Sequence, residues 1–271
     1  MTPEAEDTLE KFFGAFAGAH PPLLLLDYDG TLSPFRVDRF KARPYVGVPG
    51  LLTRIQKQGQ TRIAIITGRP AKEVAPLLGL KSPIEVWGLH GAERLYPDGR
   101  RELEAVSDLA EAKLNDLKAQ LQQDSFGGLL EDKDNGIVMH WRGAAPSKAR
   151  RIQKRTRALF EPLACLDGLE MVESEACLEL RAGRDKGGAV EAILQESSTF
   201  GSVAFLGDDL TDESAFRALK GRGLSILVRR HPRETEADIH LCPPREVKQF
   251  LKLWLAALPQ RRAPRPRLPA N

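Results

Sequence analysis

The 271-residue sequence predicts an α/β fold in which a Rossmann-like parallel sheet core is interrupted by a smaller α+β unit. Short apolar runs alternate with longer amphipathic runs as far as residue 105, which is the pattern of βα units around a parallel sheet. The pattern changes between residues 106 and 183 and then resumes to the end of the sequence. We therefore expect a discontinuous core domain formed by residues 1–105 and 184–271, with residues 106–183 inserted as a second domain.

The composition is that of an ordinary globular protein. Hydrophobic residues make up 42% of the chain and charged residues 28%, which excludes collagen-like and wholly disordered chains. The 40 basic residues nearly balance the 37 acidic ones, whereas a dedicated nucleic-acid binder needs a concentrated basic face, so we expect no nucleic-acid partner. Part of the positive charge gathers in a proline-rich tail that is most simply a solvated end: Arg261, Arg262, Arg265 and Arg267.

The sequence gives no sign of export or membrane insertion. Its first seven residues are acidic where a secretory signal would be basic, and no apolar run approaches the roughly 20 residues that a membrane-spanning helix needs. The cysteines at positions 165, 177 and 242 are far apart and predict neither a disulfide scaffold nor a zinc site. We therefore expect a monomeric, cytoplasmic protein without a membrane partner.

The first part of the core contains two short apolar runs that are expected to be buried strands, residues 23–26 and 63–66, and a further strand candidate at residues 84–87. A helix is expected from Pro49 to Gln58, with Gly59 as its stop. Pro70 suits the first position of another helix, which Pro76 should shorten or kink. Residues 96–99 read as a hairpin turn.

The inserted unit is predicted to contain two helices and a small sheet. A polar helix is expected over residues 107–123 and a strongly basic one over 147–160. The strand candidates are residues 129–133, 137–142, 177–181 and, as a fourth, 169–173.

Alternation along these strands predicts a sheet with one charged face, because residues two apart point to the same side. The charged side chains are Glu131, Lys133, His140, Arg142, Glu179 and Arg181. The apolar side chains that would pack on the helices are Ile137, Met139, Trp141, Leu178 and Leu180. From spacing alone, an ordinary solvated face is favoured over a ligand-binding one, since antiparallel sheets commonly expose one side to water.

The βα pattern resumes with a helix over residues 186–195 and a strand over 202–206. Thr211 can cap a helix that runs through Leu219 and is closed by Gly221. Two late strands are expected at residues 224–228 and 237–241, followed by a closing helix over 247–258.

Carboxylates follow two of the predicted core strands. Asp27 and Asp29 follow the first strand, and Asp208 and Asp209 follow the strand at 202–206. Parallel sheets bind ligands outside the carboxyl ends of their strands. There each pair of carboxylates at ~4 Å would repel by up to ~4 kcal/mol at an effective dielectric near 20, so the cluster needs a cation. All-oxygen ligands favour Mg²⁺. Taken singly, an Asp-Gly pair is more often a turn.

Lys186 stands where a cation is disfavoured, at the start of a predicted helix behind the cap residue Asp185. Such a lysine could offset the carboxylates and hold a phosphate oxygen, although a solvated surface lysine is an equally good interpretation of this residue alone. The sequence contains neither a GxxxxGK[ST] loop, nor GxGxxG after a strand, nor a GxSxG elbow. Nucleoside-triphosphate, dinucleotide and acyl-transfer folds therefore lose support.

These residues resemble the four ordered motifs of the haloacid dehalogenase (HAD) phosphohydrolase superfamily: residues 27–31, Thr67-Gly68, Lys186 and residues 207–213. The residues of these motifs are more similar still to those of the trehalose-6-phosphate phosphatase family. Similar signatures occur at residues 26–34, 88–93, 131–142, 179–187 and 207–213, so the resemblance covers most of the chain. Thr67 stands where the family often has serine, and Leu89 replaces a polar residue.

The resemblance implies a HAD-type core with an inserted cap and assigns roles to single residues. Asp27 would be the nucleophile that forms an aspartyl-phosphate, and Asp29 the general acid and then base. Mg²⁺ would be held by Asp27, the backbone carbonyl of Asp29 and Asp208, with Asp209 in support. Thr67 and Lys186 would bind the transferring phosphoryl group.

The resemblance also implies trehalose 6-phosphate as the substrate. It further implies that the charged face of the inserted sheet belongs to a cap whose side chains form hydrogen bonds to sugar hydroxyls. The substrate-binding residues would be Thr67, Gly68, Arg69, His90, Gly91, Glu93, Glu131, Lys133, His140, Arg142, Glu179 and Arg181. Sucrose phosphate and mannosylglycerate phosphate are alternative substrates for such a capped enzyme, and a phosphohexomutase is less favoured. A phosphosugar sensor without catalytic activity is the alternative from another class, but it should have lost an aspartate of the first motif or Lys186.

Overall fold

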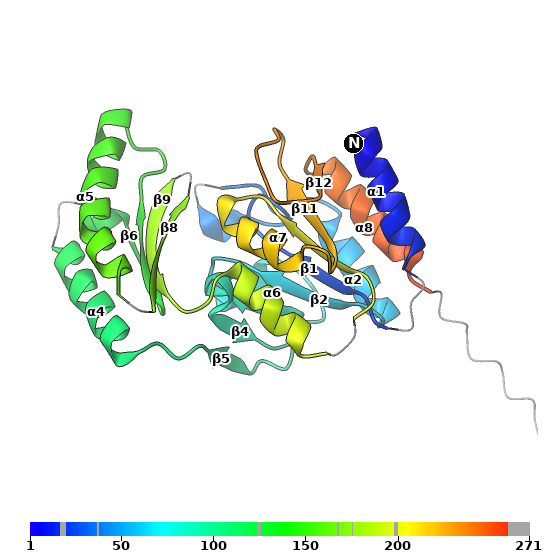
Figure 1. The fold of residues 1–271 in the computed structure, drawn as a ribbon, viewed down its shortest axis with the longest axis horizontal. Coiled ribbons are helices and arrows are strands. Elements are labelled where there is room, and N and C mark those ends of the chain that lie inside the picture. The colour runs from blue at the N-terminus through cyan, green and yellow to red at the C-terminus, as the bar shows by residue number, and fades with distance from the viewer. Residues whose placement is uncertain are drawn as a thin grey trace, which may run out of the picture.

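The computed structural model describes residues 1–16, 20–36, 38–123, 126–166, 168–174, 176–197 and 200–259. The arginine-rich tail lies outside these residues. The described chain forms an eight-stranded sheet and a separate four-stranded sheet, each with its own helices (Figure 1). The mixed α/β architecture with a parallel core confirms the predicted fold class.

The large sheet has the strand order β12-β11-β10-β1-β2-β3-β4-β5. Pairing is parallel from β12 to β3, and β4 and β5 add antiparallel strands at one edge. The strands are β1 (Leu23–Leu26), β2 (Arg62–Ile66), β3 (Glu85–Gly88), β4 (Glu93–Leu95), β5 (Arg101–Leu103), β10 (Val203–Gly207), β11 (Leu224–Val228) and β12 (Ile239–Leu241). The hairpin turn predicted at residues 96–99 joins β4 to β5. The last strand is shorter than the predicted 237–241.

Helices cover both faces of this sheet, which explains why its central strands are continuously apolar. One face carries α1 (Pro3–Gly14), α2 (Val48–Gln58), α3 (Ala71–Leu77) and α8 (Arg245–Ala257). The other carries α6 (Lys186–Gln195) and α7 (Glu213–Leu219), seen in front of the strands in Figure 1. Leu24 and Leu26 pack toward the first group, whereas Leu23 and Leu25 pack toward the second.

Some helices also differ from the sequence-based expectations. The helix α1 was not predicted; it buries Ala5 and Leu9 beside α8. The basic helix α5 (Pro146–Ala164) continues four residues past its predicted end at 160. Thr211 does not cap α7. Instead, Asp209 caps the short 3-10 helix η4 (Leu210–Asp212), because its side chain and that of Asp212 each bind backbone N–H groups at this turn.

The small sheet is antiparallel and has the order β6-β7-β9-β8. Its strands are β6 (Leu130–Lys133), β7 (Gly136–His140), β8 (Leu169–Ser174) and β9 (Cys177–Ala182), and β7 ends two residues before the predicted end at 142. Its outer face is covered by α4 (Asp108–Gln122) and α5. The predicted apolar face is confirmed: Ile137, Met139, Trp141, Leu178 and Leu180 pack against these helices.

The opposite face of the small sheet is not the solvated face that spacing alone favours. Glu131, Val138 and Glu179 lie side by side on it by strand register. Lys133 and Glu179 are 8% and 5% exposed, because the core lies across from them. Among the described helices, none has both the length and the apolarity needed to cross a bilayer.

Candidate active site

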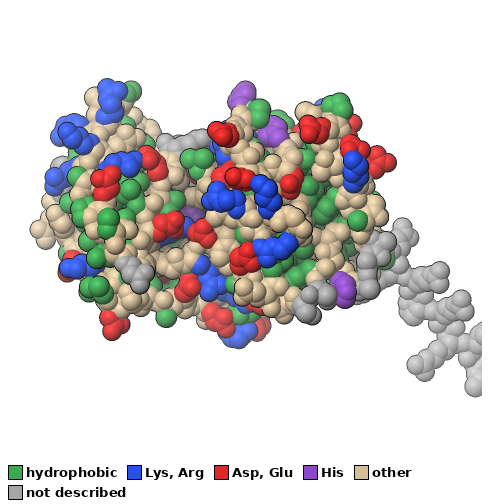
Figure 2. All heavy atoms as spheres, in the orientation of Figure 1, with side chains coloured by type: hydrophobic (Ala, Val, Ile, Leu, Met, Phe, Trp, Pro, Cys, Tyr) green, Lys and Arg blue, Asp and Glu red, His purple; other side chains and the backbone are tan. Residues whose placement is uncertain are grey.

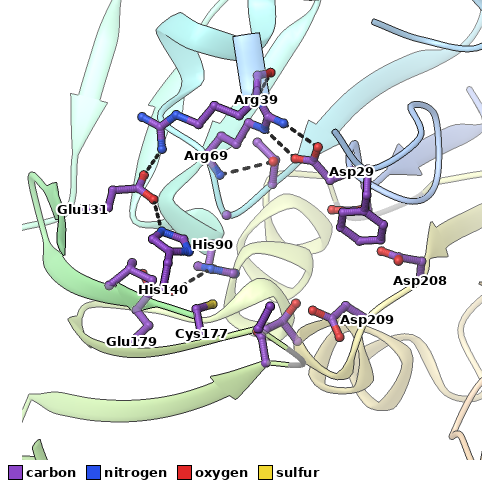
Figure 3. A pocket seen from close by; sticks show the side chains of 18 of the residues that line it. Asp29, Arg39, Arg69, His90, Glu131, His140, Cys177, Glu179, Asp208 and Asp209 are labelled. Atoms are coloured by element: carbon purple, nitrogen blue, oxygen red, sulfur yellow. Dashed lines mark hydrogen bonds and ion pairs between the residues drawn. The ribbon is translucent and has the colours of Figure 1, made fainter. Parts of the chain in front are cut away.

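A cavity lies between the carboxyl ends of the core strands and the polar face of the small sheet (Figure 3). The core supplies Asp27, Asp29, Thr67, Gly68, Arg69, His90, Lys186, Asp208 and Asp209 to its lining, and the small sheet and its loops supply Glu131, Lys133, His140, Arg142 and Glu179. Most of the predicted site residues therefore gather around one space. Outside the cavity, Figure 2 shows acidic and basic side chains interspersed, in line with the balanced overall charge.

Asp27 follows β1 and is held by a buried lysine. Its Oδ1 accepts a hydrogen bond from Lys186 Nζ at 2.7 Å, whereas its buried Oδ2 has no partner among the described residues. Lys186 also donates to Asp212 Oδ1 at 2.7 Å. Burial would lower the pKa of Lys186, but the charges of Asp212 and Asp27 outweigh it and raise the pKa. Burial raises the pKa of Asp27 to about 7, even though Lys186 opposes the shift.

Asp208 and Asp212 complete a compact carboxylate group at the end of β10. One carboxylate oxygen from each of these residues and one from Asp27 lie within 4.8 Å of one another. Asp212 Oδ2 accepts the backbone N–H groups of Asp208 and Asp209, both at 2.9 Å, and so fixes the turn. Burial, followed by the charge of Asp27, raises the pKa of Asp208. At Gly30 (φ +81°) a Cβ would lie 2.0 Å from Asp208 Oδ2, so only glycine permits this approach.

These oxygen donors fit a hard divalent cation. Three buried carboxylates face one another, and one of their oxygens has no partner among the described residues. This set differs from the predicted ligands. Asp212 joins Asp27 and Asp208, while the Asp209 carboxylate accepts from the backbone N–H of Leu210 at 2.8 Å. All-carboxylate donors without His or Cys suit Mg²⁺.

Asp29, the predicted acid and base, forms a two-pronged ion pair with Arg69. Arg69 Nε and Nη2 each donate to the carboxylate at 2.5 Å. Burial opposes the charge of Arg69, but the hydrogen bond to Asp29 and its charge raise the pKa of Arg69. The third guanidinium nitrogen donates to the backbone oxygen of Arg39 at 2.6 Å. Arg69 therefore fixes the side chain that the sequence predicts to move the proton.

Thr67 and Gly68 follow β2 at the centre of the cavity. The backbone oxygen of Thr67 accepts the N–H of His90 at 2.9 Å. His90 has a φ of +59°, and a Cβ on Gly68 would lie 2.5 Å from its Nε2. The His90 Nε2 lies 3.1 Å from Glu179 Oε2. Burial is the main reason that the pKa of His90 falls to about 3, so this imidazole is neutral and donates to Glu179.

The charged face of the small sheet reaches the core through further contacts. Lys133 Nζ donates to Glu179 Oε1 and to the backbone oxygen of Gly68, both at 2.9 Å. Burial would raise the pKa of Glu179, but the charge of Lys133 and the hydrogen bond from His90 lower it. Glu131 is bound by His140 Nε2 at 2.7 Å and by Arg39. Both glutamates are therefore ionised acceptors beside the cavity.

Three predicted substrate-binding residues do not line the cavity. Gly91 packs against Ala189 on α6, where a Cβ would come within 2.6 Å of the alanine Cβ. Glu93 is fully buried and accepts the backbone N–H of Ala71 at 2.6 Å. Arg181 pairs with Glu170 at 2.9 Å. Their contact with a substrate stays a prediction.

Sequence reasoning missed several residues that line the cavity: Phe35, Arg36, Arg39, Val138, Ser174, Ala176, Cys177, Thr211 and Arg229. Residues two apart on a strand share a face, so the alternation that selects His140 also selects Val138, and the one that selects Glu179 also selects Cys177. Sequence reasoning could therefore have found these two residues. Arg39 lies on the 3-10 helix η1 (Arg39–Lys41) in the loop after the Asp27 motif, and no periodicity marks it.

Comparisons with known proteins agree with this geometry. A family model described as trehalose-phosphatase matches residues 25–242. A Mycobacterium avium protein named trehalose-phosphate phosphatase is 30% identical over 265 residues, which cover 92% of this chain and 65% of that protein. The chain therefore spans about 65% of the length of this curated relative.

Two solved structures share the fold. The C-terminal domain of the C. albicans trehalose-6-phosphate phosphatase superposes with a TM-score of 0.78 at 22% identity, over 92% of this chain and 96% of that one. A haloacid dehalogenase-like hydrolase from B. subtilis superposes with a TM-score of 0.60 at 18% identity, over 85% of this chain and 98% of that one. The chain belongs to the trehalose-phosphatase family.

Proposed function

We propose that this chain is a Mg²⁺-dependent phosphatase that hydrolyses trehalose 6-phosphate to trehalose and phosphate. One observation carries the proposal: Asp27 has one oxygen fixed by Lys186 and the other without a partner among the described residues, beside a cavity with a polar opposite wall. The first oxygen is oriented and the second is available to attack. Membership of the trehalose-phosphatase family and the names of its curated members support the substrate.

The proposed reaction has two steps. Asp27 Oδ2 attacks phosphorus and the bond between phosphorus and the sugar oxygen breaks. Asp29, which must be protonated and released from its ion pair with Arg69 for this step, gives its proton to that leaving oxygen. Water then attacks the aspartyl-phosphate, Asp29 takes up a proton from the water, and phosphate leaves with Asp27 restored. Lys186 would balance charge on Asp27 and on the phosphoryl oxygens, and Thr67, which lines the cavity, would bind the phosphoryl group.

Asp27, Asp208 and Asp212 would hold the Mg²⁺ ion. When bound, the ion supplies positive charge that lowers the repulsion between an anionic nucleophile and an anionic phosphoryl group. The predicted contributions of the Asp29 carbonyl and of Asp209 remain part of the proposal.

The small sheet is proposed to act as a cap that selects the sugar. Its cavity-facing side chains are Glu131, Lys133, His140, Arg142 and Glu179. Hydrogen bonds to charged groups are worth ~1.5–3 kcal/mol each, so several together can select a disaccharide. A separate apolar cluster beneath α4 and α5 supports the proposed boundaries, with residues 106–183 inserted between 1–105 and 184–271. We also propose that the chain acts as a monomer in the reducing cytoplasm, which its three free cysteines would suit.

Phosphate release tests this function directly. The chain should release phosphate from trehalose 6-phosphate faster than from sucrose 6-phosphate or mannose 6-phosphate. Chelation with EDTA should abolish release, and added Mg²⁺ should restore it. Equal rates on all three esters would contradict the substrate, and full activity in EDTA would contradict the metal. No release from any ester would contradict a phosphatase and favour a phosphosugar sensor.

A further inference from the structure

We propose that Arg39 is a positioning residue that orients Glu131 toward the sugar of the leaving group, and so helps to set substrate specificity. This proposal rests on the proposed function. Arg39 belongs to the core, on η1, whereas Glu131 belongs to β6 on the other side of the cavity. Figure 3 shows the Arg39 side chain reaching from the core ribbon toward Glu131.

The Arg39 guanidinium joins acidic groups from both sides of the cavity. Its Nη1 binds Glu131 Oε1, and its Nη2 donates to Glu73 Oε1 on α3 at 2.8 Å. The other oxygen of Glu131 is 2.7 Å from His140 Nε2. Each Glu131 oxygen is therefore held by one partner, and each keeps a lone pair for a sugar hydroxyl.

Charge makes Glu131 dependent on this contact. The Glu73 and Glu131 side chains are only 13% and 17% exposed and share the Arg39 guanidinium. Without that cation, two like charges would remain at the junction and repel each other. The glutamate on β6 would then turn away from the position that its hydrogen bonds define. The fixed state of Glu131 is also an ionised one, since the hydrogen bond from His140 and the charges of Lys133 and Arg39 outweigh burial and hold its pKa near 2.

The backbone of Arg39 makes a separate contact. Its carbonyl oxygen accepts from Arg69 Nη1 at 2.6 Å, and Arg69 in turn holds Asp29. A side-chain substitution removes the contact with Glu131 but leaves this carbonyl in the chain. Arg39 should therefore affect binding of the sugar more than the chemistry at phosphorus.

The test compares trehalose 6-phosphate with p-nitrophenyl phosphate, which carries no sugar. Arg39→Ala should lower the ratio of the two kcat/KM values by about tenfold, mainly through a higher KM for trehalose 6-phosphate. Arg39→Lys keeps the charge and should recover part of the loss. Lys41→Ala is a matched control, because Lys41 lies on the same 3-10 helix and pairs with the neighbouring Asp38. It should leave the ratio as in the wild type.

A double-mutant cycle decides whether Arg39 acts through Glu131. If it does, Arg39→Ala added to Glu131→Gln should cause little further loss. Additive losses, or an unchanged ratio in Arg39→Ala, would overturn the proposal. If the wild type releases phosphate from trehalose 6-phosphate and either of these results is obtained, the role of Arg39 is contradicted but the proposed function is not. Absence of that release in the wild type overturns the proposed function first.

Discussion

At the scale of single residues, Lys186 occupies a position that the helix dipole disfavours for a cation. Neighbouring carboxylates compensate for this cost. It begins α6, where the helix dipole repels a cation, and it is 3% exposed. Two carboxylates, Asp27 and Asp212, each accept from its ammonium at 2.7 Å. A buried ammonium needs such partners, and here both partners belong to the carboxylate group that is proposed to hold Mg²⁺.

Replacement of Asp27 by asparagine tests the nucleophile. Asp27→Asn keeps the size of the side chain and removes a charge from a crowded acidic group, so the fold should persist. Turnover should fall at least about a thousandfold, because an amide cannot form the acyl-phosphate. Phosphate release and circular dichroism measure the two effects. Asp7→Asn, which removes an exposed carboxylate on α1, is the control. Near-normal turnover by Asp27→Asn would show that another group attacks phosphorus.

At the scale of elements, α6 has a low helix propensity at its start, and the contacts of its first turn fix its position. Gly187 and Gly188 follow Lys186 and lower the helix propensity. A Cβ on Gly187 would lie 2.7 Å from the backbone oxygen of Ser214, so this glycine allows α6 to approach α7. The Asp185 side chain accepts the N–H of Gly188 at 2.8 Å and caps the helix.

Loss of this cap should therefore reduce both stability and activity. Asp185→Ala should lower the free energy of unfolding by about 1 kcal/mol, and it should lower kcat because Lys186 is the next residue. Ser107→Ala is the matched control: Ser107 caps α4, with its hydroxyl accepting from Ala110 at 3.3 Å on the outer side of the small sheet. It should reduce stability without reducing kcat. Equal effects of the two variants on kcat would show that the α6 cap has no special link to the site.

At the scale of the whole molecule, the site exists only where the two sheets meet. Arg39 contacts Glu131, Lys133 contacts the backbone of Gly68, and His90 contacts Glu179. Each contact joins a core segment to a strand of the small sheet. Lys133 and Glu179 on the charged face are therefore buried and paired, whereas Arg142 of the same face remains exposed.

The burial of His90 between the two sheets predicts a pH dependence of stability, because it lowers the pKa of the imidazole in spite of the contact with Glu179. The pKa of His90 is about 3 in the folded chain against 6.5 for the ordinary group, so between these values the unfolded chain binds a proton that the folded chain excludes. The contribution of His90 to the free energy of unfolding should therefore fall as the pH falls through this window, by at most about 1.4 kcal/mol per pH unit, whereas the raised pKa values of Asp27 and Asp208 act in the opposite direction. The lowered pKa of Glu179 adds to the fall below 4.5.

Urea unfolding of the wild type and a His90 variant between pH 6.5 and 4.5 isolates the histidine, because the titration of Asp27 and Asp208 is common to both proteins. His90→Asn removes the titrating group and keeps a side chain that tolerates the φ of +59°. The variant should show a smaller loss of stability across this interval than the wild type. The same pH slope in both proteins would mean that His90 takes up its proton without unfolding.

Much of the site follows from local sequence patterns. Apolar runs place the strands of the core, and the residues after them, such as Asp27, Thr67 and Asp208, lie at the carboxyl ends of parallel strands. Because parallel strands end at a common edge, residues far apart in the sequence must gather there. The two-residue period likewise predicts which side chains of the small sheet share the polar face.

The sequence by itself therefore determined the fold class, the strand ends and the residues that meet at them. Only the tertiary structure decided which of those residues pair: Asp212 with Lys186, Arg69 with Asp29, and Arg39 with Glu131. The physical reason is the separation along the chain over which each kind of interaction acts. Periodicity and capping act within one element, whereas an ion pair depends on the distance between elements brought together by the packing of separate hydrophobic clusters.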